Sequence, residues 1–243
     1  MSLPRVVLLH GVGLDHTMWS AVVDGLTDHF DVSTPDLLGH GSRPAAPDTV
    51  TLRDLADDVA GSLEPGTHVV GFSLGALVAQ HLARFRPQLV GSLTSVSSVC
   101  RRTPAERRAV TGRLDAAATD FKGSVQASLE RWFTDTEVDA ASVRQVEETL
   151  LANDVRSYLS CYRVFAHGDQ QLAGELPHIT VPALAVTGEL DPGSTPDMTR
   201  RLAESIPGCR EVIVPGARHL LPVQAPRRLL DVLIPFLGGS SHD

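Results

Sequence analysis

The sequence predicts an α/β protein in which a mostly parallel sheet is covered by helices. Short apolar segments alternate with segments of helical periodicity through residues 5–100, and again from residue 181 onward. Polar side chains capable of chemistry directly follow several of the apolar segments. These positions are the carboxyl ends of the expected strands, where open parallel sheets bind their ligands.

The first half of the chain alternates regularly between the two periodicities. Leu52, Leu55, Val59 and Leu63 recur at helical spacing, whereas Arg5 to Leu9 is a short apolar strand pattern. The expected strands are residues 5–9, 31–34, 67–72 and 89–96, and the expected helices are residues 16–29, 52–63 and 76–84.

Residues 101–177 interrupt this alternation. They lack valine-rich runs and have the pattern of amphipathic helices, with Leu129, Trp132 and Phe133 on one apolar face. Alternation resumes with expected strands at 181–187 and 211–214 and expected helices at 196–206 and 226–237. We therefore predict a core of residues 1–100 and 178–243, and a helical lid of residues 101–177 that forms walls of a substrate pocket. The tail from Gly238 to Asp243 is expected to be frayed.

The most informative motif is Gly71-Phe72-Ser73-Leu74-Gly75, at the junction of an expected strand and helix. In a nucleophile elbow of this G-x-S-x-G form the serine lies on a sharp turn, and small flanking residues relieve crowding around it. The N-terminus of the next helix then points at a developing oxyanion. The alternative interpretation is a chance match. The residues elsewhere in the chain that accompany the motif decide between a chance match and a nucleophile elbow.

That context consists of further polar residues in a fixed order. His10-Gly11-Val12-Gly13 follows the first strand, Asp191 follows a strand through Gly188-Glu189-Leu190, and His219 follows the last strand. A serine nucleophile needs a general base, and histidine titrates near neutrality. Asp191 would orient the imidazole of His219 without taking its proton. The alternatives are Glu189 or Asp197 as the acid, His219 as a surface histidine, and Cys161 as a nucleophile without a histidine motif.

With these motifs in the order nucleophile, acid, histidine, the sequence resembles the α/β-hydrolase superfamily. The resemblance implies an α/β-hydrolase fold and an oxyanion hole formed by the amides of Val12 and Leu74. His10 is expected to hold this loop rather than act as a base, and the turn from Asp36 to Ser42 is interpreted as structural. Members commonly begin with an antiparallel hairpin that has no counterpart before Arg5, so we expect about six parallel strands.

Within the superfamily the chain is most similar to the 3-oxoadipate enol-lactonase group of small ester and lactone hydrolases. The segments that carry this resemblance are Gly13 to Trp19, Leu129-Glu130-Arg131-Trp132-Phe133-Thr134 and Tyr158 to Tyr162. It implies that Trp132 lines the substrate pocket; packing inside the lid is the alternative. Arg218 stands where relatives often carry glycine, and it could tune the histidine or face solvent.

We therefore expect a serine hydrolase that cleaves a small carboxylic ester or lactone through an acyl-enzyme. The alternatives are a carbon–carbon bond hydrolase or perhydrolase with the same residues, and a small-molecule-binding receptor that keeps the fold. A dehalogenase is disfavoured because that group has a carboxylate at the position of Ser73. No metal or cofactor is expected, because no histidine or cysteine pair has metal-ligand spacing and the glycines do not form a dinucleotide fingerprint.

Charge and cysteine content limit the partners and the compartment. The formal net charge of −8, without a basic stripe, argues against nucleic acid or an anionic membrane, and the arginines at 101–102 and 107–108 are interpreted as a solvated helix face. No apolar stretch approaches the roughly 20 residues that span a bilayer. No signal peptide is recognised before the first strand, and Cys100, Cys161 and Cys209 are too scattered for a disulfide framework. We expect a cytoplasmic protein that acts on a small molecule, and we leave a homodimer open.

Overall fold

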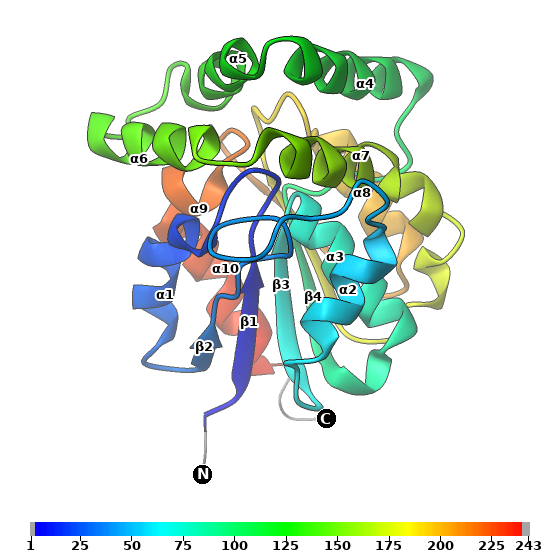
Figure 1. The fold of residues 1–243 in the computed structure, drawn as a ribbon. Coiled ribbons are helices and arrows are strands. Elements are labelled where there is room, and N and C mark those ends of the chain that lie inside the picture. Colours follow the sequence, from blue (N-terminus) through cyan, green and yellow to red (C-terminus); the bar gives the residue numbers. More distant parts are fainter. Residues whose placement is uncertain (1–2, 240–243) are drawn as a thin grey trace.

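A parallel sheet forms the centre of the molecule, with helices on both faces (Figure 1). The computed structural model describes residues 3–239. Its six strands lie in the order β2-β1-β3-β4-β5-β6, and every neighbouring pair is parallel. This confirms the predicted fold class with about six parallel strands. The strands are β1 (Arg5–Leu9), β2 (Asp31–Ser33), β3 (Thr67–Phe72), β4 (Val90–Val96), β5 (Ala183–Gly188) and β6 (Arg210–Val214).

Both faces of the sheet are buried at its centre, because side chains of β1, β3, β4 and β5 alternate between two hydrophobic clusters. Val7 and Leu9 of β1 belong to one cluster, and Val6 and Leu8 belong to the other. The first cluster is closed by α2 (Leu52–Ala60), α3 (Leu74–Phe85) and α8 (Pro196–Ser205). The second is closed by α1 (Ser20–Leu26) and α10 (Pro226–Gly239). The helices therefore enclose one hydrophobic cluster on each face of the sheet.

Several helices differ from their predicted bounds. The expected helix at 16–29 is divided into the 3₁₀ turn η1 (His16–Trp19) and α1, which ends at Leu26. The chain then turns, with the amides of His29 and Phe30 both donating to Leu26 O at 2.9 Å, before β2 begins. The short turns η2 (Pro87–Leu89) and η3 (Leu176–His178) and the helix α9 (Leu221–Gln224) were not predicted. Gly238 and Gly239 belong to α10, and the rest of the tail expected to fray lies outside the described residues.

Four helices lie between β4 and β5 in the chain: α4 (Pro104–Thr119), α5 (Phe121–Phe133), α6 (Ala140–Leu151) and α7 (Val155–Leu172). Figure 1 shows α4 and α5 farthest from the sheet, above the carboxyl ends of the strands, with α6 and α7 beneath them. The helix α7 packs directly on α3, and a Cβ on Gly168 would lie 2.8 Å from Leu77 Cδ1. The insertion is thus seated on the core through α7. Its treatment as a separate lid of residues 101–177 stays a prediction.

Arg102 corrects the interpretation of the arginines at 101–108 as a solvated helix face. Its side chain is 1% exposed and pairs with Asp169 of α7 at 2.7 Å, with the guanidinium 4.7 Å from the ring centre of Phe165. Arg101 and Arg108 are exposed as expected. Arg102 is buried because its guanidinium and amide bond to α7, and this contact joins the beginning of the insertion to its last helix.

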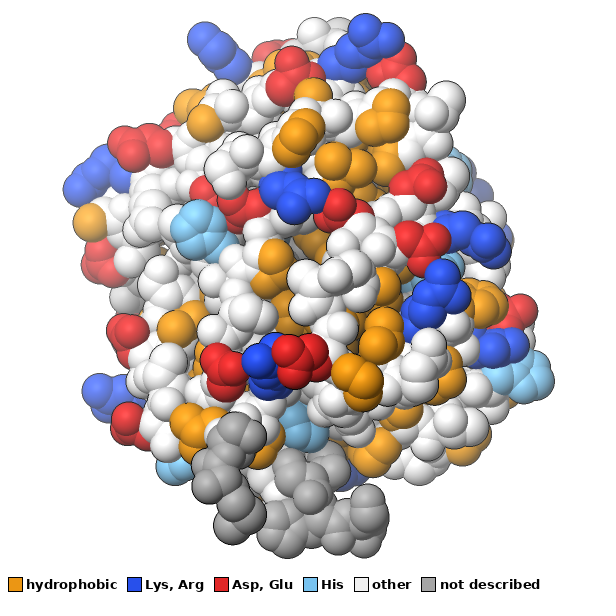
Figure 2. Space-filling view, turned by 60° about the horizontal axis from the view of Figure 1, so that its bottom comes forward, with side chains coloured by type: hydrophobic (Ala, Val, Ile, Leu, Met, Phe, Trp, Pro, Cys, Tyr) orange, Lys and Arg blue, Asp and Glu red, His pale blue; other side chains and the backbone are white. Residues whose placement is uncertain are grey.

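The surface carries charges of both signs. Figure 2 shows Lys and Arg side chains interspersed with Asp and Glu side chains over the face that it presents. None of the helices within residues 3–239 has the length and apolar character needed to cross a bilayer.

Candidate active site

Ser73 lies on a strained turn between β3 and α3. Its φ of 53° and ψ of −108° are unusual for a residue with a side chain. Gly71 and Gly75 make this turn possible: a Cβ on Gly71 would lie 2.1 Å from Gly75 O, and one on Gly75 would lie 2.3 Å from Leu9 O. Both glycines of the G-x-S-x-G motif are therefore required by close backbone contacts, as a nucleophile elbow demands.

The structure brings Asp191 and His219 into direct contact. Asp191 Oδ2 lies 2.7 Å from His219 Nδ1, and both side chains are buried. The histidine backbone is held as well, since Ser97 Oγ donates to His219 O at 2.9 Å. Because Asp191 contacts Nδ1, the Nε2 atom of the imidazole is left for another partner.

Asp191 is fixed by its own loop. Its Oδ1 accepts hydrogen bonds from the amides of Gly193 and Ser194, each at 2.8 Å. The other candidate acids lie elsewhere. Glu189 accepts from the Gly216 amide at 2.9 Å, and Asp197 pairs with Arg200 at 2.6 Å on the exposed first turn of α8. Among the three candidates, only Asp191 contacts His219 within the described chain.

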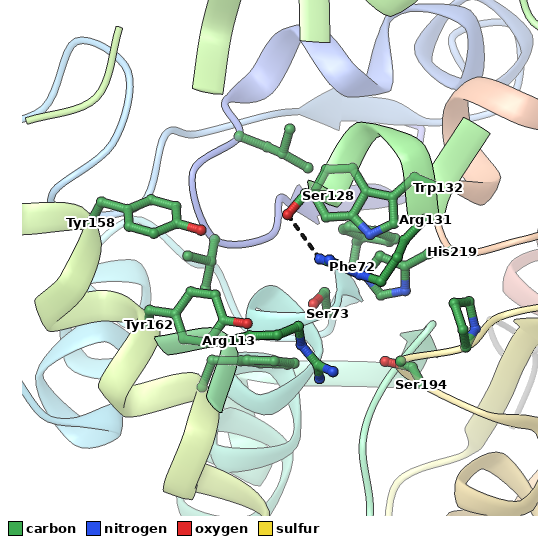
Figure 3. A pocket seen from close by; sticks show the side chains of 15 residues that line it. Phe72, Ser73, Arg113, Ser128, Arg131, Trp132, Tyr158, Tyr162, Ser194 and His219 are labelled. Carbon is green, nitrogen blue, oxygen red and sulfur yellow. Dashed lines mark hydrogen bonds between the residues drawn. The ribbon is translucent and has the colours of Figure 1, made fainter. Parts of the chain in front are cut away.

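Ser73 and His219 line the same cavity, which has about 600 Å³ of space, part of it open to solvent (Figure 3). Within residues 3–239 no hydrogen bond joins the Ser73 hydroxyl to the imidazole. Catalytic hydrogen bonds are often long in ligand-free structures and tighten with substrate. The geometry is therefore that of a serine beside an oriented histidine.

The two amides expected to form an oxyanion hole belong to a residue that lines the cavity and to the residue that follows Ser73. The Leu74 amide is the first of α3, and Val12 lines the cavity. In the described part of the chain neither amide donates to another protein group. The loop that carries Val12 is anchored from the insertion, because Asn153 Nδ2 donates to Gly13 O at 2.8 Å. Within the described residues, both amides are thus free of protein acceptors, as an oxyanion hole requires.

His10 fixes the loop that carries Val12 through hydrogen bonds of its imidazole ring. The Leu37 amide donates to His10 Nε2 at 2.9 Å, so the proton resides on Nδ1, which donates to Gly11 O at 2.8 Å. Burial lowers the pKa of His10 to about 4. A fully buried, neutral and doubly bonded histidine fits the expected structural role and is not placed to act as a base.

The turn from Asp36 to Ser42 is built around one carboxylate. Asp36 Oδ1 accepts from the His16 amide at 2.9 Å, and Oδ2 accepts from the Ser42 amide at 3.1 Å. Burial opposes ionisation of this group, but the hydrogen bonds from His16 and Ser42 outweigh it and lower the pKa of Asp36 to about 2. These bonds support the structural interpretation of the turn.

Trp132 lies over the imidazole of His219. Their ring centres are 5.6 Å apart, with 30° between the planes, and the half-buried indole lines the cavity. Gln224 of α9 joins the two segments: its Nε2 donates to Trp132 O, and its Oε1 accepts from the Arg218 amide at 3.0 Å. The Arg218 guanidinium forms an ion pair with Asp135, at 3.8 Å, and its side chain is mostly buried. Arg218 therefore does not lie free in solvent.

Among the cavity residues that were not singled out from the sequence, two carry a charge, Arg113 of α4 and Arg131 of α5 (Figure 3). Arg131 precedes Trp132 in a segment that carried the family resemblance, and Ser128, Arg131 and Trp132 share one side of α5 at helical spacing. That spacing could have indicated Arg131. Arg113 carries no comparable signal, because its position depends on how α4 crosses α5.

The comparisons with known proteins agree with this geometry. Residues 6–232 match the alpha/beta hydrolase family. The chain belongs to this family. It is 30% identical to (E)-2-((N-methylformamido)methylene)succinate hydrolase from Acinetobacter baylyi over 228 residues, covering 92% of this chain and 86% of that protein. It is also 30% identical to pimeloyl-(acyl-carrier protein) methyl ester esterase from Aeromonas hydrophila, covering 97% and 96% of the two chains.

Among solved structures, the enol-lactonase from Burkholderia xenovorans aligns with a TM-score of 0.88 and 27% identity, covering 98% of this chain and 92% of that one. The resemblance to the α/β-hydrolase superfamily is thereby confirmed, and the protein is a hydrolase whose relatives include esterases and a lactonase.

The cysteines of this hydrolase are poor candidates for a nucleophile. Cys100 and Cys161 are buried and free, and burial raises the pKa of each thiol to about 12. A thiol with that pKa carries almost no thiolate near neutrality. Within residues 3–239, no cluster of His, Cys, Asp and Glu has the arrangement of a metal site.

Proposed function

We propose that this hydrolase cleaves a small carboxylic ester or lactone through an acyl-enzyme, with Ser73, His219 and Asp191 as its catalytic triad. The observation that carries the proposal is the meeting of the elbow serine and the Asp191–His219 pair at one cavity. The names of the relatives, an esterase and an enol-lactonase among them, support this class of substrate. A homodimer and a cytoplasmic location remain predictions from the sequence.

The proposed reaction begins when Ser73 Oγ attacks the substrate carbonyl and its proton passes to His219 Nε2. Asp191 holds the imidazole by Nδ1 and stabilises the imidazolium that forms. The amides of Val12 and Leu74 would donate to the oxyanion. The bond to the leaving oxygen then breaks, and this oxygen takes the proton from His219. A water then attacks the acyl-enzyme carbonyl and passes a proton to His219 Nε2. The bond to Ser73 Oγ breaks, Oγ takes the proton back from His219, and the acid is released.

A fluorophosphonate probe tests the nucleophile. We expect the probe to label the native protein at Ser73, to fail with Ser73→Ala, and to label Cys161→Ala as well as the native protein. Labelling of Ser73→Ala at another residue would contradict the proposed triad. A protein that binds esters without labelling would instead be a small-molecule-binding receptor.

A substrate panel then tests the bond that is cleaved. 4-Nitrophenyl esters and aliphatic lactones should be turned over faster than vinylogous diketones, whose cleavage breaks a carbon–carbon bond. The opposite order, with Ser73 still labelled, would favour a carbon–carbon bond hydrolase with the same triad.

A further inference from the structure

Ser97 lies at the carboxyl end of β4, between the segments that carry the three residues of the proposed triad. The carbonyl that precedes it, Val96 O, accepts from the Ser73 amide at 2.9 Å. The Ser97 amide donates to Val186 O of β5, the strand that precedes the acid, at 2.8 Å. The Ser97 hydroxyl donates to His219 O at 2.9 Å. Two consecutive residues at the end of β4 are thus bonded to the segments of the nucleophile, the acid and the base.

Ser97 keeps a backbone conformation that residues with a side chain rarely adopt. Its φ is 47°, in the left-handed region that favours glycine. Within residues 3–239, four residues other than glycine have a positive φ, and Ser73 and Ser97 are the two of them that are buried. Strain of this kind persists only where surrounding contacts maintain it, and it is concentrated at active sites. The side chain of Ser97 therefore contributes something that the glycine favoured by this backbone would not.

The Ser97 hydroxyl is not needed to satisfy the carbonyl of His219. The Leu221 amide already donates to His219 O at 2.9 Å. That bond lies within the segment that follows β6, so it does not fix this segment relative to the sheet. The Leu190 amide donates to Ala217 O at 2.8 Å and joins the segment to the acid loop. The bond from Ser97 instead joins the base to β4, the strand paired with β3, which carries the nucleophile.

We propose that Ser97 is a positioning residue, which sets the place of His219 relative to Ser73 through the carboxyl end of β4. This inference rests on the proposed function, in which His219 takes the proton of Ser73. Ser97 is fully buried and is not among the residues that line the cavity, so it acts on the reaction through His219. The rate depends steeply on this placement, because a displacement of about 1 Å can cost about 100-fold.

Two substitutions at Ser97 separate the hydroxyl from the backbone. Ser97→Ala removes the hydroxyl and keeps the strain, whereas Ser97→Gly removes the hydroxyl and relieves the strain. Both should lower kcat on a 4-nitrophenyl ester by about 10- to 100-fold with little change in KM. Ser97→Gly should nonetheless melt roughly 2–4 °C above Ser97→Ala, because glycine adopts a positive φ freely. A positioning role predicts that activity follows the hydroxyl and not the stability of the fold.

Arg101 is the matched control, because it has a φ of 45° but is exposed and does not line the cavity. Arg101→Gly should melt above Arg101→Ala by a similar amount, and both variants should keep the native kcat. A native kcat in Ser97→Ala would overturn the inference, as would a kcat that recovers in Ser97→Gly together with stability. A raised KM at the native kcat would also overturn it, because Ser97 would then affect substrate binding.

Proton NMR follows the placement of His219 without any turnover. The Nδ1 proton that bonds Asp191 should give a low-field signal in the native protein, identified by its absence from His219→Gln. The signal should shift or broaden in both Ser97 variants and stay unchanged in Arg101→Gly. A native protein that cleaves no ester but shows this response would overturn the proposed function and keep the positioning role. Ester cleavage in which neither kcat nor the signal responds to Ser97 would overturn the positioning role and keep the function.

Discussion

Ser73 has a backbone conformation that only a tightly built turn can maintain. Its φ of 53° and ψ of −108° belong to a sparsely populated region, which costs of order 1–3 kcal/mol. The turn persists because the Ser73 amide donates to Val96 O at 2.9 Å and the Gly75 amide donates to His10 O at 3.1 Å. Strain of this kind is typical of active sites, where it exposes a reacting group that a relaxed turn would bury.

The contact between Asp191 and His219 leads to a prediction about the acid. Asp191→Asn should lower kcat on a 4-nitrophenyl ester by roughly 10³–10⁴-fold with little change in KM, because an amide favours the wrong imidazole tautomer. Glu189→Gln is the matched control, since Glu189 bonds the Gly216 amide and not the histidine. Steady-state kinetics on both variants decides the matter, and a larger loss for Glu189→Gln would reassign the acid.

Trp132 allows a second test, because the chain has another tryptophan for comparison. Trp19 is 0% exposed in the core, whereas Trp132 is half-buried over His219. Trp19→Ala should cost about 3–5 kcal/mol of unfolding free energy. Trp132→Ala should cost less, but should change the preference among acyl chain lengths, since pocket contacts discriminate by about 1–3 kcal/mol per methylene.

Urea unfolding and a chain-length series on the two variants give the answer. A stability loss at Trp132 as large as that at Trp19, with unchanged selectivity, would make Trp132 a packing residue of the insertion.

At the scale of elements, a buried ion pair joins the beginning of the insertion to its last helix. Arg102 immediately precedes the N-cap of α4, and Asp169 lies near the end of α7, so the pair joins the first and last of the four helices. Asp169 Oδ2 also accepts from the Arg102 amide at 2.8 Å. The pair therefore sets where α4 begins relative to α7, and with it where Arg113 lies over the cavity.

Removing one partner of this pair should be worse than removing both. Arg102→Met should lower the unfolding free energy by about 3–5 kcal/mol, because it leaves the Asp169 carboxylate buried and uncompensated. Arg102→Met/Asp169→Leu should recover most of that loss, since well-packed apolar residues often replace a buried pair without cost. Chemical unfolding of the single and double variants measures both quantities, and additive losses would show that the pair is not coupled.

At the scale of the whole molecule, features set by residues close together in the sequence were predicted, and features set by contacts between distant segments were not. The bounds of β1 and β3 were predicted to the residue, because each ends where a motif residue, His10 or Ser73, begins a turn. The four-residue helix α9 was missed, since Leu221-Pro222-Val223-Gln224 is too short to show a period. The burial of Arg102 and the cavity position of Arg113 depend on how α4 crosses α5 and α7, which no local pattern encodes.

The acid stability of the molecule should reflect its buried histidines. Burial lowers the pKa of His10 to about 4, and burial together with the charge of His10 lowers that of His40 to about 3. In the unfolded chain histidine titrates near 6.5. Below that pH the unfolded state binds protons that the folded state does not, so the unfolding free energy falls as the pH falls from about 6.5. The fall for His10 continues to about pH 4 and reaches roughly 3 kcal/mol, since each pKa unit corresponds to about 1.4 kcal/mol.

Asp36 extends the loss to lower pH. Its folded pKa is depressed to about 2, so the stability that it contributes is present above about pH 4 and is lost as the pH falls toward 2. Urea unfolding at pH 7.5, 6.5, 5.5 and 4.5 should therefore give a free energy that changes little between pH 7.5 and 6.5 and falls at pH 5.5 and 4.5, a range in which this carboxylate stays ionised in the folded protein. His10→Gln should be less stable at pH 7.5, because it disturbs the bonds to Gly11 and Leu37, and should lose less on acidification. His178→Gln, at an exposed site, is the matched control for the loss of a histidine. An unfolding free energy that stays constant from pH 7.5 to 4.5 would show that His10 and His40 gain protons in the folded protein, against the effect of their burial.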